Sequence, residues 1–223
     1  MVLHASGILL HMTRNEITRL RLYNQYIFHS DIATPSDVVK RLGAMQAQDY
    51  PGALWSIGLR LPGITKTEVE AAIARREIVR TWPMRGTLHF VPAEDTRWMI
   101  ELMTPRVITS AAHRVRNLEL NDDIFEQARQ IFTKNLQGGK VLTRSKMNAL
   151  LDEAGIASKG QRGIHVMWRL SQEGLLCYGP HEGKEPTFTL LSDWVPTAKS
   201  KPRDESIALI AERYFISHGP ATK

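Results

Sequence analysis

Apolar residues recur every three or four positions in several stretches of the chain, a spacing that places them on one face of an α-helix. In the first half these stretches begin after Thr13, Thr34 and Thr65, and Thr13 with Glu16 forms a capping box. The stretch that starts at Thr34 runs towards residues 45–48. In the second half we expect helices at residues 124–136, 144–154 and 163–173.

Short β-hairpins follow the helices in both halves of the chain. Residues 78–91 contain two short apolar runs separated by a Pro-Met-Arg-Gly turn. Residues 175–179 and 187–191 are likewise two strands around a polar loop. An order of helices followed by a two-stranded wing is typical of the winged-helix fold, in which the third helix enters the major groove of DNA. The sequence therefore predicts a mainly α chain with small β-wings, arranged as tandem winged-helix (helix-turn-helix) units.

The same pattern divides the chain into units. We expect a first winged-helix-like unit at residues 12–118, a second at 119–193 and a Pro-, Lys- and Ser-rich linker at 194–204. Residues 205–223 contain one amphipathic helix, which cannot bury its own face and is interpreted as the first helix of an incomplete third unit. Residues 1–11 are expected to be a disordered extension.

Composition and charge narrow the partners. The chain has 223 residues, of which 43% are hydrophobic and 23% charged, which is ordinary for a globular protein. Its net charge of +6 favours an anionic partner, either nucleic acid or less often a membrane surface. No segment approaches the ~20 apolar residues of a membrane span. The single cysteine, Cys177, suits a reducing compartment, so we expect a cytoplasmic protein.

Metal-ligand spacing is absent from the sequence, and we expect neither a metal nor a small-molecule cofactor. The expected partner is duplex DNA, without a membrane. Candidates for contacts with phosphates and base edges lie at and before the helix at 163–173: Lys159, Gln161, Arg162 and Arg169. Arg114 and Arg116 fit a role along the DNA backbone, although a solvated helix face explains them equally well. A protein-binding surface remains an alternative for the second unit.

Gln46 and Gln48 form the most informative short motif. They lie where a helix must be ending, before Pro51, so their side chains could converge. A glutamine amide does not titrate near neutral pH, but two amides can hold and orient a water molecule. The alternative is a pair of solvated polar residues at a helix end.

Three longer stretches carry a family resemblance: residues 42–49, residues 81–89 and residues 217–222. Together they resemble the AlkZ-like and YcaQ-like winged-helix DNA glycosylases. The resemblance implies tandem winged-helix units around a basic concave surface that binds DNA. It also implies hydrolysis of the N-glycosidic bond of N7-alkylated purines, including those in interstrand crosslinks. The family's catalytic pair, glutamine–apolar–glutamine or glutamine–apolar–aspartate, matches Gln46 and Gln48.

An N7-alkylated purine is already cationic, so it can leave without a general acid, and the enzyme has only to position water at the sugar. Arg85, Thr87 and His89 are further candidates near such a site, although His89 is somewhat better explained as a packed strand residue. Family members extend well beyond residue 223, so the chain is expected to be truncated. A non-catalytic DNA-binding regulator is the main alternative function, and a protein-interaction module is the third.

Overall fold

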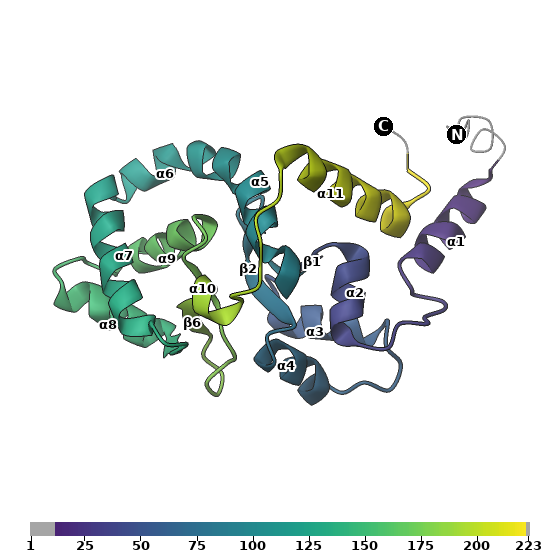
Figure 1. Cartoon of the computed structure of the whole chain (residues 1–223), viewed down its shortest axis with the longest axis horizontal. Helices are drawn as coiled ribbons and strands as arrows, with labels where there is room; N and C mark the ends of the chain where they lie inside the picture. The colour runs from purple at the N-terminus through teal and green to yellow at the C-terminus, as the bar shows by residue number, and fades with distance from the viewer. Residues whose placement is uncertain (1–11, 222–223) are drawn as a thin grey trace.

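The computed structural model describes residues 12–221, and α-helices make up most of its regular structure. Figure 1 shows a small sheet in the middle of the molecule, with a group of helices on each side of it. The prediction of a mainly α chain with small β elements is therefore confirmed. The extension expected at residues 1–11 lies outside the described residues.

The first half of the chain consists of short helices, a β-hairpin and a long helix. Its elements are α1 (Arg14–Asn24), α2 (Pro35–Leu42), β1 (Met45–Gln46), α3 (Tyr50–Gly58), α4 (Lys66–Ala74), β2 (Ile78–Met84), β3 (Thr87–Pro92), the 3-10 helix η2 (Ala93–Asp95), α5 (Thr96–Ser110) and α6 (Ala112–Asn117). The hydroxyls of Thr13, Thr34 and Thr65 each accept a hydrogen bond from a backbone N–H of the first helical turn. These caps explain why α1, α2 and α4 begin where the sequence predicts.

The second half follows the predicted order of three helices and a hairpin. Its elements are α7 (Asp122–Leu136), β4 (Leu142–Thr143), α8 (Arg144–Glu153), α9 (Arg162–Gln172), β5 (Leu176–Tyr178), β6 (Thr187–Leu190), α10 (Leu191–Trp194) and α11 (Arg203–His218). The predicted helices and strands agree with these bounds to within one or two residues. The short strand β4, which pairs with β6, was not predicted.

The strands of both halves form one antiparallel sheet with the order β1-β3-β2-β5-β6-β4. The two hairpins meet through β2 and β5, where Arg80 is paired with Tyr178. The sequence suggests two separate wings, and local periodicity cannot reveal this pairing because the two strands lie far apart in the chain. As a result, β2 is an interior strand, and its residues from Ile78 to Pro83 are buried.

The predicted continuation of α2 towards residue 48 is wrong. The helix ends at Leu42, and its C-cap Gly43 has a φ of 77°, a conformation that favours glycine. The chain then turns into the extended strand β1, which pairs with β3 at the edge of the sheet. An extended backbone is favoured over a helical one here, because the free edge of β3 supplies hydrogen-bond partners that another helical turn would lack.

The terminal helix α11 packs across α2 and α5 and contacts α1, as Figure 1 shows. Arg213 of α11 forms an ion pair with the buried Asp95 of η2. Part of its apolar surface stays exposed, including Ile207, Phe215 and Ile216. The division of the chain into units remains a prediction, although this helix does have packing partners within the described residues.

The apolar core consists of three clusters around the sheet. One lies among α7, α8, α9 and the second hairpin, one among α2, α3, α4 and the sheet, and one between β2–β3 and α5. Among residues 12–221, no helix is long and apolar enough to cross a membrane.

Candidate active site

The two candidate glutamines lie on β1 and directly after it. β1 pairs antiparallel with β3, with Gln46 opposite His89. The backbone stays extended beyond β1, because the N–H of Ala47 donates to the carbonyl oxygen of Leu88 at 2.8 Å. Side chains alternate along an extended backbone, so Gln46 and Gln48 share the exposed face while Ala47 is buried. The sheet, not a helix end, brings the two amides together.

A hollow of about 300 Å³ lies beside the two amides, where the chain enters α3. We call it the α3 hollow, and it is lined by Gln46, Gln48, Asp49, Gly52, Ala53 and Ser56. Asp49 occupies the N-cap position of α3, but its side chain makes no capping hydrogen bond. A Cβ atom at Gly52 would lie 2.4 Å from Oδ2 of Asp49, so glycine at this position leaves room for the carboxylate. The α3 hollow therefore presents two amides and one carboxylate.

The two glutamines are held differently. The backbone N–H of Leu88 donates to Oε1 of Gln48 at 3.2 Å, which orients this amide and uses part of its acceptor capacity. Within residues 12–221, the side chain of Gln46 makes no hydrogen bond that would orient it. Gln48 is thus anchored to β3, whereas Gln46 is free to bind a ligand or a water molecule.

A buried arginine fastens the backbone between the glutamines. Nε and Nη2 of Arg80 donate to the carbonyl oxygen of Ala47 at 3.1 and 2.8 Å. The rings of Tyr50 and Tyr178 lie 5.0 and 4.9 Å from its guanidinium carbon, which are cation–π distances. Burial lowers the pKa of Arg80 below its ordinary value. Arg80 therefore positions the peptide that carries both amides.

A second hollow, of about 350 Å³, lies on the side of Gln46 that faces α11. We call it the α11 hollow, and it is lined by Leu42, Ala44, Gln46, Met84, Arg85, His89, Met103, Ile210, Tyr214 and His218. Of the residues that line the two hollows, only Gln46 lines both. The α11 hollow is assembled from α2, β1, the β2–β3 hairpin, α5 and α11, which no local sequence pattern connects.

The three candidates on the first hairpin lie close to the glutamines. His89 is only 3% exposed, and its Nδ1 lies 2.9 Å from the carbonyl oxygen of Thr87. Burial lowers the pKa of His89 below its ordinary value, so the imidazole is neutral at pH 7. Arg85 is exposed at the turn, where its φ is 53°. The hydroxyl of Thr87 is buried without a hydrogen-bond partner.

The candidates for phosphate contact lie away from the glutamines, on α6 and before α9. Nη2 of Arg114 donates to Oε1 of Gln161 at 2.6 Å, which joins the two elements at the surface. Arg116 and Lys159 are exposed as well. These side chains form a polar, basic surface that solvent or a ligand can reach.

Two other candidates on α9 make contacts within the protein. Nε of Arg162 donates to the carbonyl oxygen of Ala157 at 2.9 Å, and Nη1 donates to those of Leu118 and Glu119. Arg169 forms an ion pair with Glu173 at the end of the same helix, and its guanidinium carbon lies 5.1 Å from the ring centroid of Phe125 in α7. Both arginines therefore join α9 to its surroundings, and their guanidinium groups are partly occupied.

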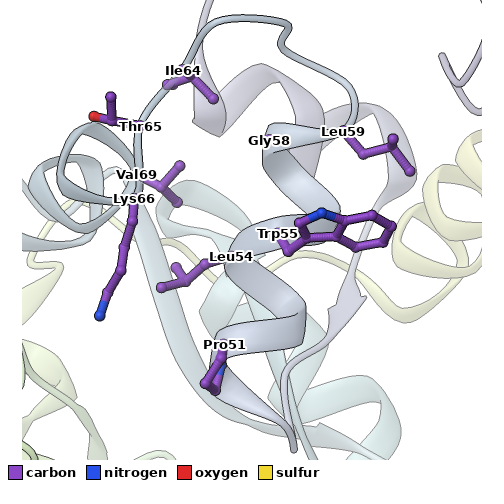
Figure 2. Close-up of a pocket in the computed structure, with 9 residues that line it drawn as sticks. All are labelled: Pro51, Leu54, Trp55, Gly58, Leu59, Ile64, Thr65, Lys66 and Val69. Carbon is purple, nitrogen blue, oxygen red and sulfur yellow. The ribbon is translucent and has the colours of Figure 1, made fainter.

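A further hollow lies elsewhere, between α3 and α4, and Figure 2 shows the side chains that line it. It has a volume of about 410 Å³ and is mainly apolar, with the 68% exposed indole of Trp55 on one side. It shares no lining residue with the α3 hollow or the α11 hollow. We therefore do not include it in the candidate active site.

The sequence analysis missed two residues of this site. Asp49 follows the second glutamine directly, and its position before the helix-starting Pro51 was the available signal. Arg80 lies in the middle of an apolar run, where a charged side chain must have a specific partner. The partner itself, the carbonyl oxygen of Ala47, could not be found without the fold.

Comparisons with known proteins agree with one another. The family described as "DNA glycosylase AlkZ-like" matches residues 39–223 of this chain. The "Interstrand DNA cross-link repair glycosylase" of Streptomyces sahachiroi is 28% identical over 219 residues, covering 91% of this chain and 56% of the relative. The solved structure of the Streptomyces sahachiroi DNA glycosylase AlkZ superimposes with a TM-score of 0.75 at 25% identity, over the same shares of the two chains. This chain thus spans about half the length of the relatives it matches.

Proposed function

Because this chain belongs to the AlkZ-like DNA glycosylase family, we propose that it binds duplex DNA and hydrolyses the N-glycosidic bond of an N7-alkylated or crosslinked purine. The observation that carries the proposal is the pair of amides on one exposed face of β1, beside the Asp49 carboxylate in the α3 hollow. The name of the Streptomyces relative supports crosslinked DNA as the substrate class.

The reaction needs little from the protein beyond positioning and charge. The bond between C1′ and the base nitrogen breaks, and its electron pair neutralises the cationic base. The oxygen of a water molecule held by Gln46 and Gln48 forms the new bond to C1′. Its proton passes to Asp49 or to solvent, and the same carboxylate stabilises the positive charge that develops on the sugar. No general acid is required because the leaving purine is already cationic.

The architecture that would present DNA to this site is a tandem winged-helix fold. In this proposal α7, α8, α9 and the β5–β6 hairpin form the second unit at residues 119–193, and residues 12–118 form the first. Residues 194–204 link them to α11, which begins a third unit. The pairing of β2 with β5 supports a fixed arrangement of the two wings, since it makes them parts of one sheet.

We assign phosphate contact to exposed basic and amide side chains of the second unit and its neighbour α6. Arg114, Arg116, Lys159 and Gln161 are exposed, as such contacts require. Arg85 extends this surface towards the glutamines. Arg162 and Arg169 contribute to DNA binding indirectly, by holding α9 in place through their contacts with the segment after α6 and with Phe125 of α7.

The decisive experiment is single-turnover release of base from a duplex containing N7-methylguanine. The wild-type chain should release the base. Gln46→Ala, Gln48→Ala and Asp49→Asn should each slow release on the order of tenfold or more, with little change in the dissociation constant for undamaged duplex. Gln130→Ala, at an exposed glutamine of α7, is the matched control and should behave as wild type.

Base release by the three variants at the wild-type rate would contradict the proposal. Binding of duplex DNA without any release by the wild-type chain would favour the non-catalytic regulator. The fold of each variant is checked first by circular dichroism, because a disrupted strand edge would imitate a catalytic loss.

A further inference from the structure

Gln46 borders two hollows of different character. The α3 hollow contains the second amide and the carboxylate of Asp49, which suit a water molecule and a positive sugar. The α11 hollow contains mainly apolar and aromatic side chains. When water attacks the sugar carbon from the face opposite the leaving base, the water and the base lie on opposite sides of the sugar. A sugar placed at Gln46 would lie beside both hollows, since Gln46 lines each of them.

From this arrangement we infer that the α11 hollow receives the purine base of the damaged nucleotide, while the α3 hollow holds the attacking water. The inference rests on the proposed function and adds a base-binding site to it. A base outside the stack is recognised in enzymes by aromatic or apolar stacking and by hydrogen bonds to its edge. The α11 hollow offers both.

Its size and its walls suit a planar ring. A volume of about 350 Å³ is within the range of small-molecule sites, roughly 300–1,000 Å³. The rings of Tyr214 and His218 stack on each other with centroids 4.9 Å apart and an interplanar angle of 10°. Met84 and Met103 supply polarisable, adaptable surface. The stacked pair is the natural platform for a base.

The hollow also tolerates a cationic purine. Its two imidazoles, those of His89 and His218, are neutral at pH 7, because burial lowers the pKa of each. The face of an aromatic ring such as Tyr214 attracts a cation. Arg85 is the one arginine or lysine among the lining residues, and its exposure at the turn allows it to reach a flanking phosphate instead of the base.

A hydrogen-bond acceptor is available for the edge of the base. Nδ1 of His89 must donate to the carbonyl oxygen of Thr87, since a carbonyl cannot donate, so the neutral ring keeps its lone pair on Nε2. A guanine presents N–H donors on its Watson–Crick edge, and the Nε2 lone pair of His89 is an acceptor that matches one of them.

The test compares two adjacent residues of α11. Tyr214 is 51% exposed and Phe215 is 53% exposed, but only Tyr214 lines the hollow. Tyr214→Ala should slow single-turnover release of N7-methylguanine on the order of tenfold, the scale of a lost base–aromatic stack. Phe215→Ala should leave the rate unchanged, and Tyr214→Phe, which restores the ring, should recover most of the loss.

A second measurement reports on the hollow without catalysis. Free 7-methylguanine is titrated into the wild-type protein and both alanine variants by calorimetry, and Tyr214→Ala alone should weaken binding. Equal rates and equal binding for Tyr214→Ala and Phe215→Ala would overturn the inference, even if Gln46 and Gln48 prove essential. If the wild-type chain releases no base but binds the free purine through Tyr214, the proposed function fails and the base site stands.

Discussion

At the scale of single residues, the two glutamines have different physical situations. Gln48 accepts a hydrogen bond from the N–H of Leu88, and Gln46 lines both hollows without such an anchor. Similar side chains on one strand can therefore contribute differently to folding and to chemistry. Gln48 combines a structural contact with its proposed catalytic role, whereas Gln46 faces only the site.

This difference predicts unequal effects on stability. Gln48→Ala should lower the free energy of unfolding by about 1 kcal/mol, because it leaves the N–H of Leu88 without its partner. Gln46→Ala should lower it by less, since no hydrogen bond is lost. Urea unfolding at neutral pH measures both values. Equal losses for the two variants would show that the contact between Gln48 and Leu88 is not formed in solution.

One buried and two half-buried histidines predict a pH dependence of stability. Burial lowers the pKa of His89, His181 and His218 below the ordinary value of 6.5. The unfolded chain then binds protons that the folded chain does not, so the free energy of unfolding falls as the pH drops from about 6.5 through the folded pKa values. Urea unfolding at pH 7.5 and pH 5.5 should show this fall.

Histidine variants identify which side chain causes the fall in the free energy of unfolding between pH 7.5 and pH 5.5. His89→Gln should make the fall between the two pH values smaller, whereas His113→Gln, at an exposed histidine of α6, should leave it unchanged. A wild-type protein that is equally stable at both pH values would contradict the assignment.

At the scale of elements, the site depends on how β1 is fastened. β1 pairs with β3 on one side, and Arg80 of β2 reaches across to the carbonyl oxygen of Ala47. The tyrosines that hold Arg80 come from α3 and β5, so both halves of the chain contribute to its position. The joined sheet is thus part of the site and not only a scaffold.

Arg80 can be tested as a positioning residue. Arg80→Met keeps the bulk but removes both hydrogen bonds to Ala47, so base release should slow on the order of tenfold while the affinity for undamaged duplex stays the same. Arg80→Lys should recover part of the rate. Arg76→Met is the matched control, because Arg76 also lies over an aromatic ring, that of Trp194, and donates to a backbone carbonyl, but away from the glutamines. Equal rates for Arg80→Met and Arg76→Met would exclude the positioning role.

At the scale of the whole molecule, charge predicts that DNA binding depends on salt. The net charge is +6, and basic residues are exposed on α6 and in the segment just before α9. The affinity for random-sequence duplex should fall steeply between low and moderate salt, as phosphate contacts release counterions. Arg116→Gln should reduce the slope of log affinity against log salt by about 0.9, the value for one phosphate contact.

A charge-matched control separates this contact from a general effect of charge. Arg75→Gln removes the same charge from an arginine that is paired with Glu77 just after α4, and should leave the slope nearly unchanged. Fluorescence anisotropy at several salt concentrations gives the slopes. Tight binding to a single sequence with little dependence on salt would favour the regulator.

Local sequence patterns were sufficient to predict where several helices start and the order of helices and hairpin in the second half. Thr34, Thr65 and Asn121 cap helices through hydrogen bonds within one turn, so local composition is sufficient to place those starts. The second hairpin is likewise set by apolar runs around a polar loop. The motif of two glutamines with one apolar residue between them was also visible, together with its resemblance to a family of known chemistry.

The way the glutamines are presented depends on contacts between distant parts of the chain. Strand β1, the pairing of β2 with β5, the burial of Arg80 and the internal contacts of Arg162 all depend on partners far away in the chain. Hydrogen-bond partners of this kind are set by which strand edges and carbonyl groups meet in the folded molecule. Local periodicity does not show which strand edges and carbonyl groups come together. The sequence could therefore identify the two amides but not the two hollows beside them.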